Sequence, residues 1–173
     1  MSRQRRDSAD APTTRLSDGT YAQIVESTFT TGYELIVDGT PQSHVDLDDP
    51  THLHFEYVAR MGAVIDQLRQ QVIELESALV DLVRGALPLP EGASIRVRHG
   101  DARAVLQAMP AGLKGTADLL VSDVFAGAQT PAHVTSVEFY REVSTMLAPE
   151  GVLLVNLADG PGLAYARRQV ATV

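Results

Sequence analysis

Three successive segments share one pattern, in which a short apolar run ends on a carboxylate and a helical pattern follows. The runs are Gln71–Glu76, Ser94–Asp101 and Leu119–Ser122, and their acids are Glu74 with Glu76, Asp101, and Asp123. Repeated strand–helix units predict parallel strands joined by right-handed crossovers. Because ligands bind at the carboxyl ends of such strands, we expect Glu74, Asp101 and Asp123 to line one cleft. Three acids on one rim favour a ligand with hydroxyl or amino donors, or a cation.

The first 50 residues predict a different structure. Residues 1–15 are polar, contain Pro12, and predict a disordered tail. Short strands are predicted at Thr20–Glu26, Tyr33–Val37 and Gln42–Asp46, and the Asp-Gly pair at 38–39 is typical of a hairpin turn. We therefore expect a small N-terminal antiparallel β unit over 16–50. Residues 51–173 predict a doubly wound α/β domain with a mostly parallel sheet.

Helical patterns begin at Thr51 and recur over 77–87, 102–109, 135–147 and 163–173. Ser77, Asp101, and Thr135 or Ser136 are the expected N-caps. Glu138 stands three residues after Thr135, which fits a capping box. The junction before Ser77 is unusual, because no Gly, Pro, Asn or Ser turns the chain between Ala63 and Ser77.

Each acid also has a purely structural explanation. A carboxylate at Glu74 or Glu76 would be favoured by the dipole of the helix that follows it. Asp101 stands where an N-cap belongs, so capping alone explains an aspartate there. Asp123 is different, since no helical pattern begins within its reach. A ligand-binding role is therefore better supported for Asp123 than for the others.

Composition excludes several classes of function. The chain has 14 Lys+Arg against 22 Asp+Glu, a net charge of −8, which disfavours nucleic acid as a partner. It has no cysteine, and its five histidines show no HxxxH or HExxH spacing, so we expect no metal site. The N-terminus lacks an apolar signal segment, and the longest apolar run, Val152–Val155, is too short to cross a bilayer. We expect a cytoplasmic protein without a membrane partner. No GxSxG, GxxxxGK[ST] or GxGxxG motif occurs.

Five segments, in order, resemble motifs of the spermidine synthases, the aminopropyltransferases of polyamine biosynthesis. The similarity is closest to divergent bacterial spermidine synthase-like proteins. The segments are LIVDGTPQS (35–43), VIELE (72–76), HGDAR (99–103), LLVSDVFAG (119–127) and SVEFYREVSTMLAPEGVLLVN (136–156). They resemble the family's L-x-x-D-G-x-x-Q, V-V-E-I-D, G-D-A/G, V-D-S-S-D-P and T-x-E-F-Y-x-x-x-x-x-x-L-x-P-G-G-V-L-V-x-Q.

The resemblance implies a role for four residues. Gln42 would contact the nucleoside-bearing cosubstrate, Glu74 would hold the ribose hydroxyls, and Asp101 would hold the adenine amino group. Asp123 would orient and deprotonate the attacking amine, which must be neutral to attack a sulfonium carbon. The implied cosubstrate is decarboxylated S-adenosylmethionine or S-adenosylmethionine, with no prosthetic group. The implied acceptor is a small-molecule amine.

The chain departs from the family pattern at several positions. Ala126 replaces the second acid of D-x-x-D, the family's Tyr-His/Gln-Glu triplet is His54-Phe55-Glu56, and Ala22 replaces the Gln that follows the first Tyr. The G-G-G-D-G loop, with the strand before it, is missing between Asp66 and Gln71. The resemblance implies that residues 51–173 form a Rossmann-like α/β domain of the class I methyltransferase type. The family also continues with further strands, so this domain is expected to be incomplete. If the chain is continuous at Leu68–Gln70, the strand from Gln71 is expected to pair with the strand that ends at Asp123.

Two other functions remain open from the sequence. A methyltransferase on the same scaffold would use S-adenosylmethionine. The pair Asp123 and Ala126 discriminates between the two enzymes, because it leaves only one acid to bind an amine. A catalytically inactive relative would instead serve as an association module, which the missing glycine loop favours. In that case Tyr21–Asp46 would form the dimerisation surface of a homodimer.

Overall fold

The computed structural model describes residues 11–62, 70–89, 91–126 and 129–173. The chain divides into two compact units, one ending at His99 and the other beginning at Gly100. The domain boundary at residue 50 that the sequence analysis expects stays a prediction. Within the described ranges, none of the helices has the length and apolar character needed to cross a membrane.

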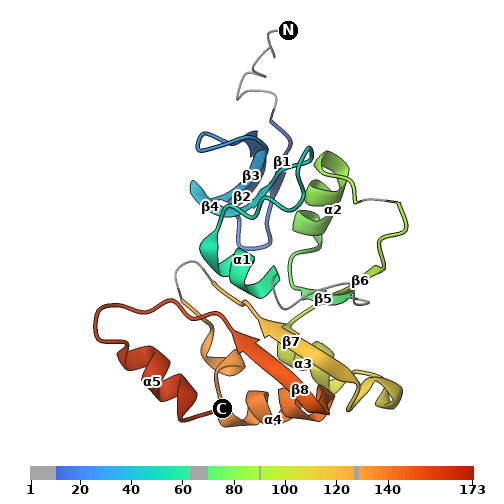
Figure 1. Cartoon of the computed structure of the whole chain (residues 1–173), viewed down its shortest axis with the longest axis vertical. Helices are drawn as coiled ribbons and strands as arrows, with labels where there is room; N and C mark the ends of the chain where they lie inside the picture. Colours follow the sequence, from blue (N-terminus) through green and yellow to red (C-terminus); the bar gives the residue numbers. More distant parts are fainter. Residues whose placement is uncertain (1–10, 63–69, 90, 127–128) are drawn as a thin grey trace, which may run out of the picture. The chain divides into compact units, whose positions relative to one another are not determined.

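A four-stranded antiparallel sheet in the order β1-β2-β3-β4 opens the first unit (Figure 1). Its strands are Thr13–Arg15, Tyr21–Glu26, Tyr33–Val37 and Thr40–Val45. The hairpin predicted at 38–39 is confirmed, since Asp38 and Gly39 both have positive φ, at 46° and 73°. The strand β1 lies inside the segment predicted as a tail, because Thr13–Arg15 pairs with β2 from Tyr21 to Gln23.

One face of this sheet is covered by α2 (Ser77–Ala86). Leu79, Leu82, Val83 and Ala86 of α2 pack against Ala22, Ile24 and Leu35 of the sheet and against Leu87. Their spacing of three, four and seven residues places them on one side of a helix, which explains why α2 buries this stripe. A shorter helix, α1 (Glu56–Gly62), lies before it in the chain.

Among the strands that the structure describes, the predicted single parallel sheet is not found. In its place, β5 (Gln70–Glu74) pairs in parallel with β6 (Ile95–His99), and β7 (Ala117–Ser122) pairs in parallel with β8 (Leu147–Val155). Each pair is a separate two-stranded sheet. The parallel direction and the α/β class are therefore confirmed, whereas one large sheet is not.

The resemblance to the spermidine synthases predicts a further strand between β5 and β7, that of the glycine-rich unit, for which the sequence has no G-G-G-D-G motif. Direct pairing between β5 and β7, the arrangement expected for a continuous chain, does not occur among the described strands. The junction predicted at Leu68–Gln70 lies largely outside the described residues.

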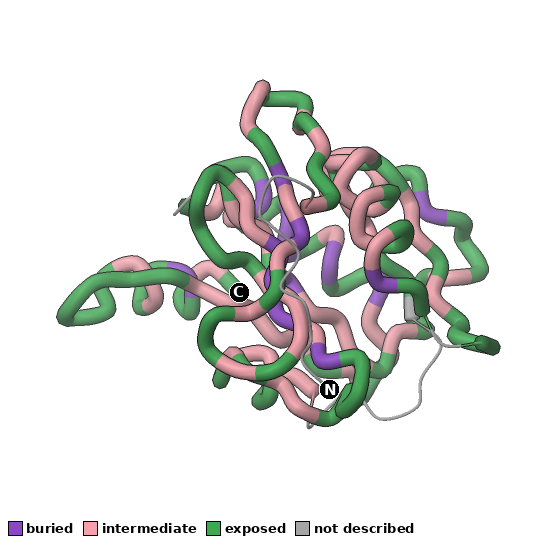
Figure 2. Tube along the Cα trace, turned by 90° about the horizontal axis from the view of Figure 1, so that it is seen from above, coloured by how far each residue is buried: buried purple, intermediate pink, exposed green. Residues whose placement is uncertain are grey.

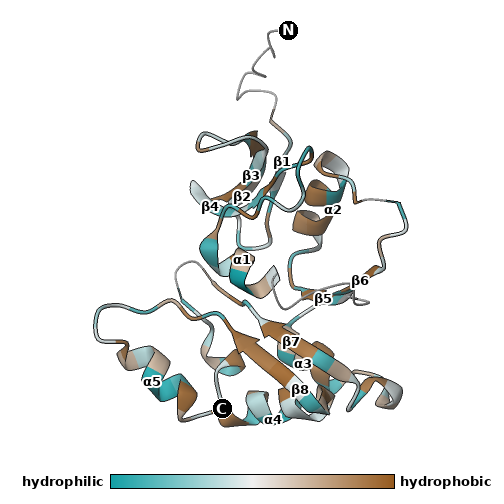
Figure 3. Cartoon of the chain, viewed as in Figure 1, coloured by the Kyte–Doolittle hydropathy of each residue, from teal (hydrophilic) through white to brown (hydrophobic). Residues whose placement is uncertain are grey.

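In the second unit, buried apolar residues gather on α3, η3 and α4, which contact one another. The described helical segments are α3 (Ala102–Gln107), η2 (Ala111–Leu113), η3 (Ala132–Val134), α4 (Val137–Met146) and α5 (Ala164–Val170). The face of α4 formed by Phe139, Tyr140, Val143 and Met146 is buried. Figure 2 shows buried residues as short stretches between partly exposed ones, and Figure 3 shows the apolar character of β7 and β8.

The helix starts agree only partly with the predicted caps. Asp101 caps α3, since its Oδ1 accepts the backbone N–H of Ala104 at 3.0 Å. Ser136, and not Thr135, caps α4 by accepting the N–H of Phe139, so Glu138 does not complete the predicted capping box. Ser77 is not a cap, because α2 begins after Glu76, which makes no capping bond with its side chain.

Candidate functional site

Asp123 lies directly beyond the carboxyl end of β7, with its side chain exposed. The partner strand β8 ends one residue before Asn156, whose backbone N–H donates to the Ser122 carbonyl at 2.9 Å. This continuation of the strand pairing brings the Asn156 side chain to Asp123. Asn156 Nδ2 then donates to Asp123 Oδ1 at 2.8 Å. The side-chain amide of Asn156 thus holds one oxygen of the Asp123 carboxylate, while the carboxylate stays exposed to solvent.

Asn156 was missed as a site residue by the sequence analysis. It stands where the resembled motif L-V-x-Q has its glutamine, and it follows β8 as Asp123 follows β7. Both observations were available from the sequence. After Asp123, Ala126 and Gln129 exchange backbone hydrogen bonds of 2.7 and 3.3 Å.

Asp101 is held by two different donors. Its Oδ1 caps α3, and its Oδ2 lies 2.6 Å from Nε2 of His133. The Ala104 N–H and then the His133 side chain lower the pKa of Asp101, so the carboxylate is ionised at neutral pH. Both side chains remain substantially exposed, at 39% for Asp101 and 51% for His133. No sequence pattern indicated His133, because 32 residues separate it from Asp101.

Glu74 ends β5 and is half-buried. Its Oε1 accepts the backbone N–H of Glu76 at 2.8 Å, which fixes the turn into α2 and leaves Oε2 for a ligand. Glu76 has a structural role, since its carboxylate accepts both the backbone N–H and the hydroxyl of Ser17. Glu74 belongs to the first unit, and Asp101 and Asp123 belong to the second. A shared cleft for all three stays a prediction.

Gln42 lies on β4 with an exposed side chain. Its Nε2 approaches the Thr40 carbonyl at 3.4 Å, a weak contact that leaves the amide able to turn toward a ligand. Its backbone carbonyl accepts a hydrogen bond from the Tyr57 hydroxyl at 3.2 Å, which ties β4 to α1. The role that the resemblance gives to Gln42 also stays a prediction.

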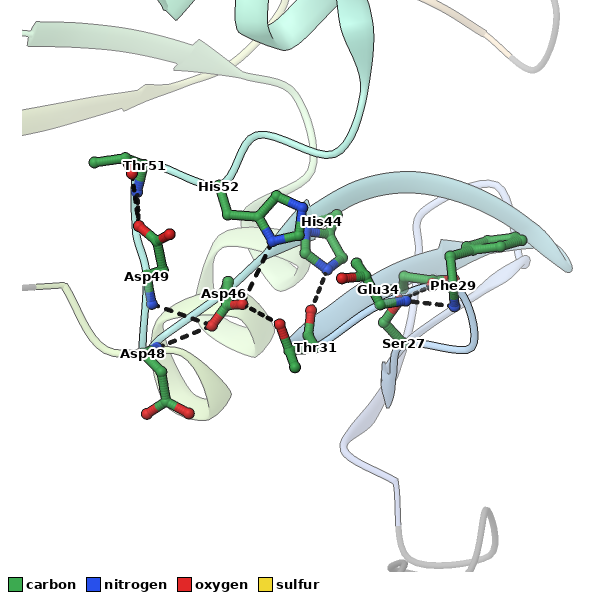
Figure 4. A network of polar contacts seen from close by, with 11 residues as sticks. Ser27, Phe29, Thr31, Glu34, His44, Asp46, Asp48, Asp49, Thr51 and His52 are labelled. Atoms are coloured by element: carbon green, nitrogen blue, oxygen red, sulfur yellow. Dashed lines mark hydrogen bonds and ion pairs between the residues drawn. The ribbon is translucent and has the colours of Figure 1, made fainter.

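A partly buried network of polar side chains fixes the loop after β4 (Figure 4). Asp46 is 5% exposed and accepts the Thr31 hydroxyl and the backbone N–H groups of Asp48 and Asp49. The Thr31 hydroxyl is the largest cause that lowers the pKa of Asp46 from 3.8 to about 2. His52 Nδ1 lies 3.5 Å from the same carboxylate. Thr31 lies in the β2–β3 loop and the other partners lie in the loop after β4, so Asp46 joins the two loops and is explained as a structural residue.

The Asp46 network continues to a buried histidine, His44. Its Nε2 lies 2.7 Å from the Thr31 carbonyl, and because a carbonyl only accepts, Nε2 carries the proton. The ring lies 5.5 Å from that of His52 and 5.3 Å from that of His54. Across the described residues, no group of histidines and acids has the arrangement of a metal site. The rings of His52 and His54 both pack against that of His44.

Comparison with known proteins supports the fold. No model of a protein family matches the chain, and no curated protein matches it. The chain is similar to the crystal structure of a probable spermidine synthase from Corynebacterium glutamicum, with a TM-score of 0.78 and 28% sequence identity. The match covers 94% of this chain and 69% of that protein. This chain therefore has a spermidine synthase-like fold.

Proposed function

We propose that the chain is a spermidine synthase-like transferase, which moves an aminopropyl group from decarboxylated S-adenosylmethionine to a small-molecule amine. The observation that carries this proposal is Asp123, an exposed carboxylate at the end of β7 that Asn156 holds through one oxygen. The similarity to a probable spermidine synthase supports an aminopropyltransferase-like role for such a group.

In the proposed reaction, Asp123 accepts a proton from the acceptor ammonium group. The neutral nitrogen attacks the aminopropyl carbon that is bonded to the sulfonium, and a C–N bond forms as the C–S bond breaks. The bonding pair stays on sulfur, which leaves as a neutral thioether, 5′-methylthioadenosine. Asn156 donates to Asp123 Oδ1, so Oδ2 keeps both of its lone pairs for the amine. General-base assistance of this kind contributes roughly 100- to 10,000-fold.

In this proposal, two acids that follow other strands, together with Gln42, bind the cosubstrate. Glu74 Oε2 would accept from the ribose hydroxyls, Asp101 from the adenine amino group, and Gln42 would contact the nucleoside. The ionised state of Asp101 suits an amino donor, because a carboxylate only accepts hydrogen bonds. The net charge of −8 also suits a cationic sulfonium and a cationic amine.

The test is an assay of the chain with millimolar decarboxylated S-adenosylmethionine and a panel of amines. We expect 5′-methylthioadenosine and the aminopropylated amine in equal amounts, and much less of both with Asp123→Asn. A methyltransferase is the second candidate, favoured by Ala126, which leaves the far end of a diamine without the family's second acid. It would instead release S-adenosylhomocysteine from S-adenosylmethionine. Failure to form either product with the folded protein would overturn both and support the association module.

A further inference from the structure

We infer that His133 is a positioning residue, which orients the Asp101 carboxylate and thereby makes the nucleoside site select a 6-amino purine. This inference rests on the proposed function, in which Asp101 accepts a hydrogen bond from the adenine amino group. The observation behind it is the 2.6 Å contact between His133 Nε2 and Asp101 Oδ2.

The backbone that carries His133 is fixed before any ligand binds. His133 is the middle residue of η3, between Ala132 and Val134, and Val134 is only 2% exposed. The Val134 N–H donates to the Pro131 carbonyl at 3.1 Å, and the Thr135 hydroxyl donates to the Ala132 carbonyl at 3.1 Å. Residues of η3 contact both α3 and α4. The imidazole is therefore presented to Asp101 from a short segment anchored in the core.

Two donors at opposite oxygens fix the plane of the Asp101 carboxylate. The Ala104 N–H holds Oδ1 at 3.0 Å and His133 holds Oδ2. A carboxylate oxygen has two lone pairs, so each oxygen keeps one for a ligand. Because a carboxylate cannot donate, the proton in this contact belongs to His133 Nε2. Without His133, Asp101 would keep its cap, but Oδ2 would be free to turn in solvent.

A fixed, ionised acceptor distinguishes two purines that differ at one position. The 6-amino group of adenine donates to it, whereas the 6-oxo group of hypoxanthine presents a second acceptor and is repelled. Immobilising one side chain before binding changes affinity by about 3- to 10-fold. That gain applies only to the ligand that uses the fixed oxygen. Loss of His133 should therefore weaken binding of the amino ligand and spare the oxo ligand.

The contact between His133 and Asp101 contributes little to the stability of the fold, so a change in binding after substitution of His133 would not be due to unfolding. Ion pairs between half-exposed side chains such as these, at 39% and 51% exposure, stabilise a fold only slightly. Substitution of His133 should thus leave the melting temperature nearly unchanged. The conservative variant is His133→Gln, because the glutamine Nε2 can reach Asp101 and donate as the imidazole does. Lys114→Ala, at an exposed position of the same unit, is the matched control.

The experiment is an NMR titration of wild type and the three variants with 5′-methylthioadenosine and with its 6-oxo counterpart, 5′-methylthioinosine, up to millimolar concentrations. We expect His133→Ala to weaken binding of the adenosine compound by about 3- to 10-fold, with the inosine compound within about twofold of wild type. His133→Gln and Lys114→Ala should keep the wild-type preference.

Three results would overturn the inference while leaving the proposed function in place: His133→Ala without effect, an equal loss for both nucleosides, or the same loss of preference in His133→Gln. If wild type binds neither nucleoside, or binds both equally, the nucleoside site of the proposed function fails as well.

Discussion

Asp123 and Asn156 test the proposed chemistry at the scale of single residues. Asp123→Asn keeps the size of the side chain but removes the proton acceptor, so we expect turnover to fall by about 100-fold or more. Nucleoside affinity should stay within about threefold, because Asp123 acts on the amine. Steady-state rates and a separate binding titration would measure the two effects.

Asn156→Ala is the companion variant. It leaves the Asp123 carboxylate in place but removes the donor at 2.8 Å that orients it. We expect an intermediate loss of turnover, smaller than for Asp123→Asn, with little change in the apparent KM. Full activity in either variant would remove that residue from the mechanism.

Asp46 gives a pH-dependent prediction about stability. Its pKa is about 2 in the folded protein against 3.8 without the fold. A lowered folded pKa means that the ionised carboxylate stabilises the fold above about pH 4, and that this contribution is lost as pH falls toward 2. Asp46→Asn lacks the contribution at every pH. The stability difference between wild type and variant should therefore shrink from pH 5 to pH 2 in denaturant titrations, and a constant difference would contradict the assignment.

Two glycines make a matched pair at the scale of elements. Gly39 is in the β3–β4 hairpin with φ of +73°, and Gly85 lies in α2; neither has an atom within 4 Å of an added Cβ. In the left-handed conformation of residue 39, the Cβ of an alanine comes too close to the following carbonyl oxygen. Gly39→Ala should therefore destabilise the protein by roughly 1 kcal/mol. An alanine at 85 favours the helix, so Gly85→Ala should stabilise it by roughly 0.5 kcal/mol. Chemical unfolding of both variants would show whether the signs are opposite.

Local signals predicted the elements well, and contacts distant in sequence were missed. The Asp-Gly hairpin and the cap at Asp101 were predicted because their hydrogen bonds lie within a few residues. Asn156 was predictable from its place after β8, although its contact with Asp123 spans 33 residues. His133 was not predictable, since its meeting with Asp101 depends on how η3 packs against α3.

For the whole molecule, the sequence predicted the type of strand connection but not the assembly of the sheet. Parallel pairing of β5 with β6 and of β7 with β8 follows from the helices that connect them. The resemblance predicts one further strand to join these pairs into one sheet, and the sequence lacks the G-G-G-D-G motif of that strand's loop. Strands in parallel sheets are usually covered on both faces, yet Val72 on β5 and Val152 on β8 are exposed, at 38% and 48%.

The missing unit leads to a prediction about affinity. In Rossmann-like folds, a glycine-rich loop at the switch point supplies backbone N–H groups to the ligand, and no such motif occurs in this sequence. Glu74, Asp101 and Gln42 would then bind the cosubstrate without those donors. Each lost hydrogen bond weakens binding by roughly 0.5–1.5 kcal/mol.

The chain should therefore bind S-adenosylmethionine and its decarboxylated form only weakly, with a Kd well above the micromolar range. Isothermal titration with each compound would measure this. A grafted variant, in which a strand and G-G-G-D-G loop of the family are inserted between Asp66 and Gln71, should bind at least about tenfold more tightly, the equivalent of one or two restored hydrogen bonds. Micromolar affinity in the chain without the graft would contradict the argument, because it would mean that the acids of the strand ends suffice for binding.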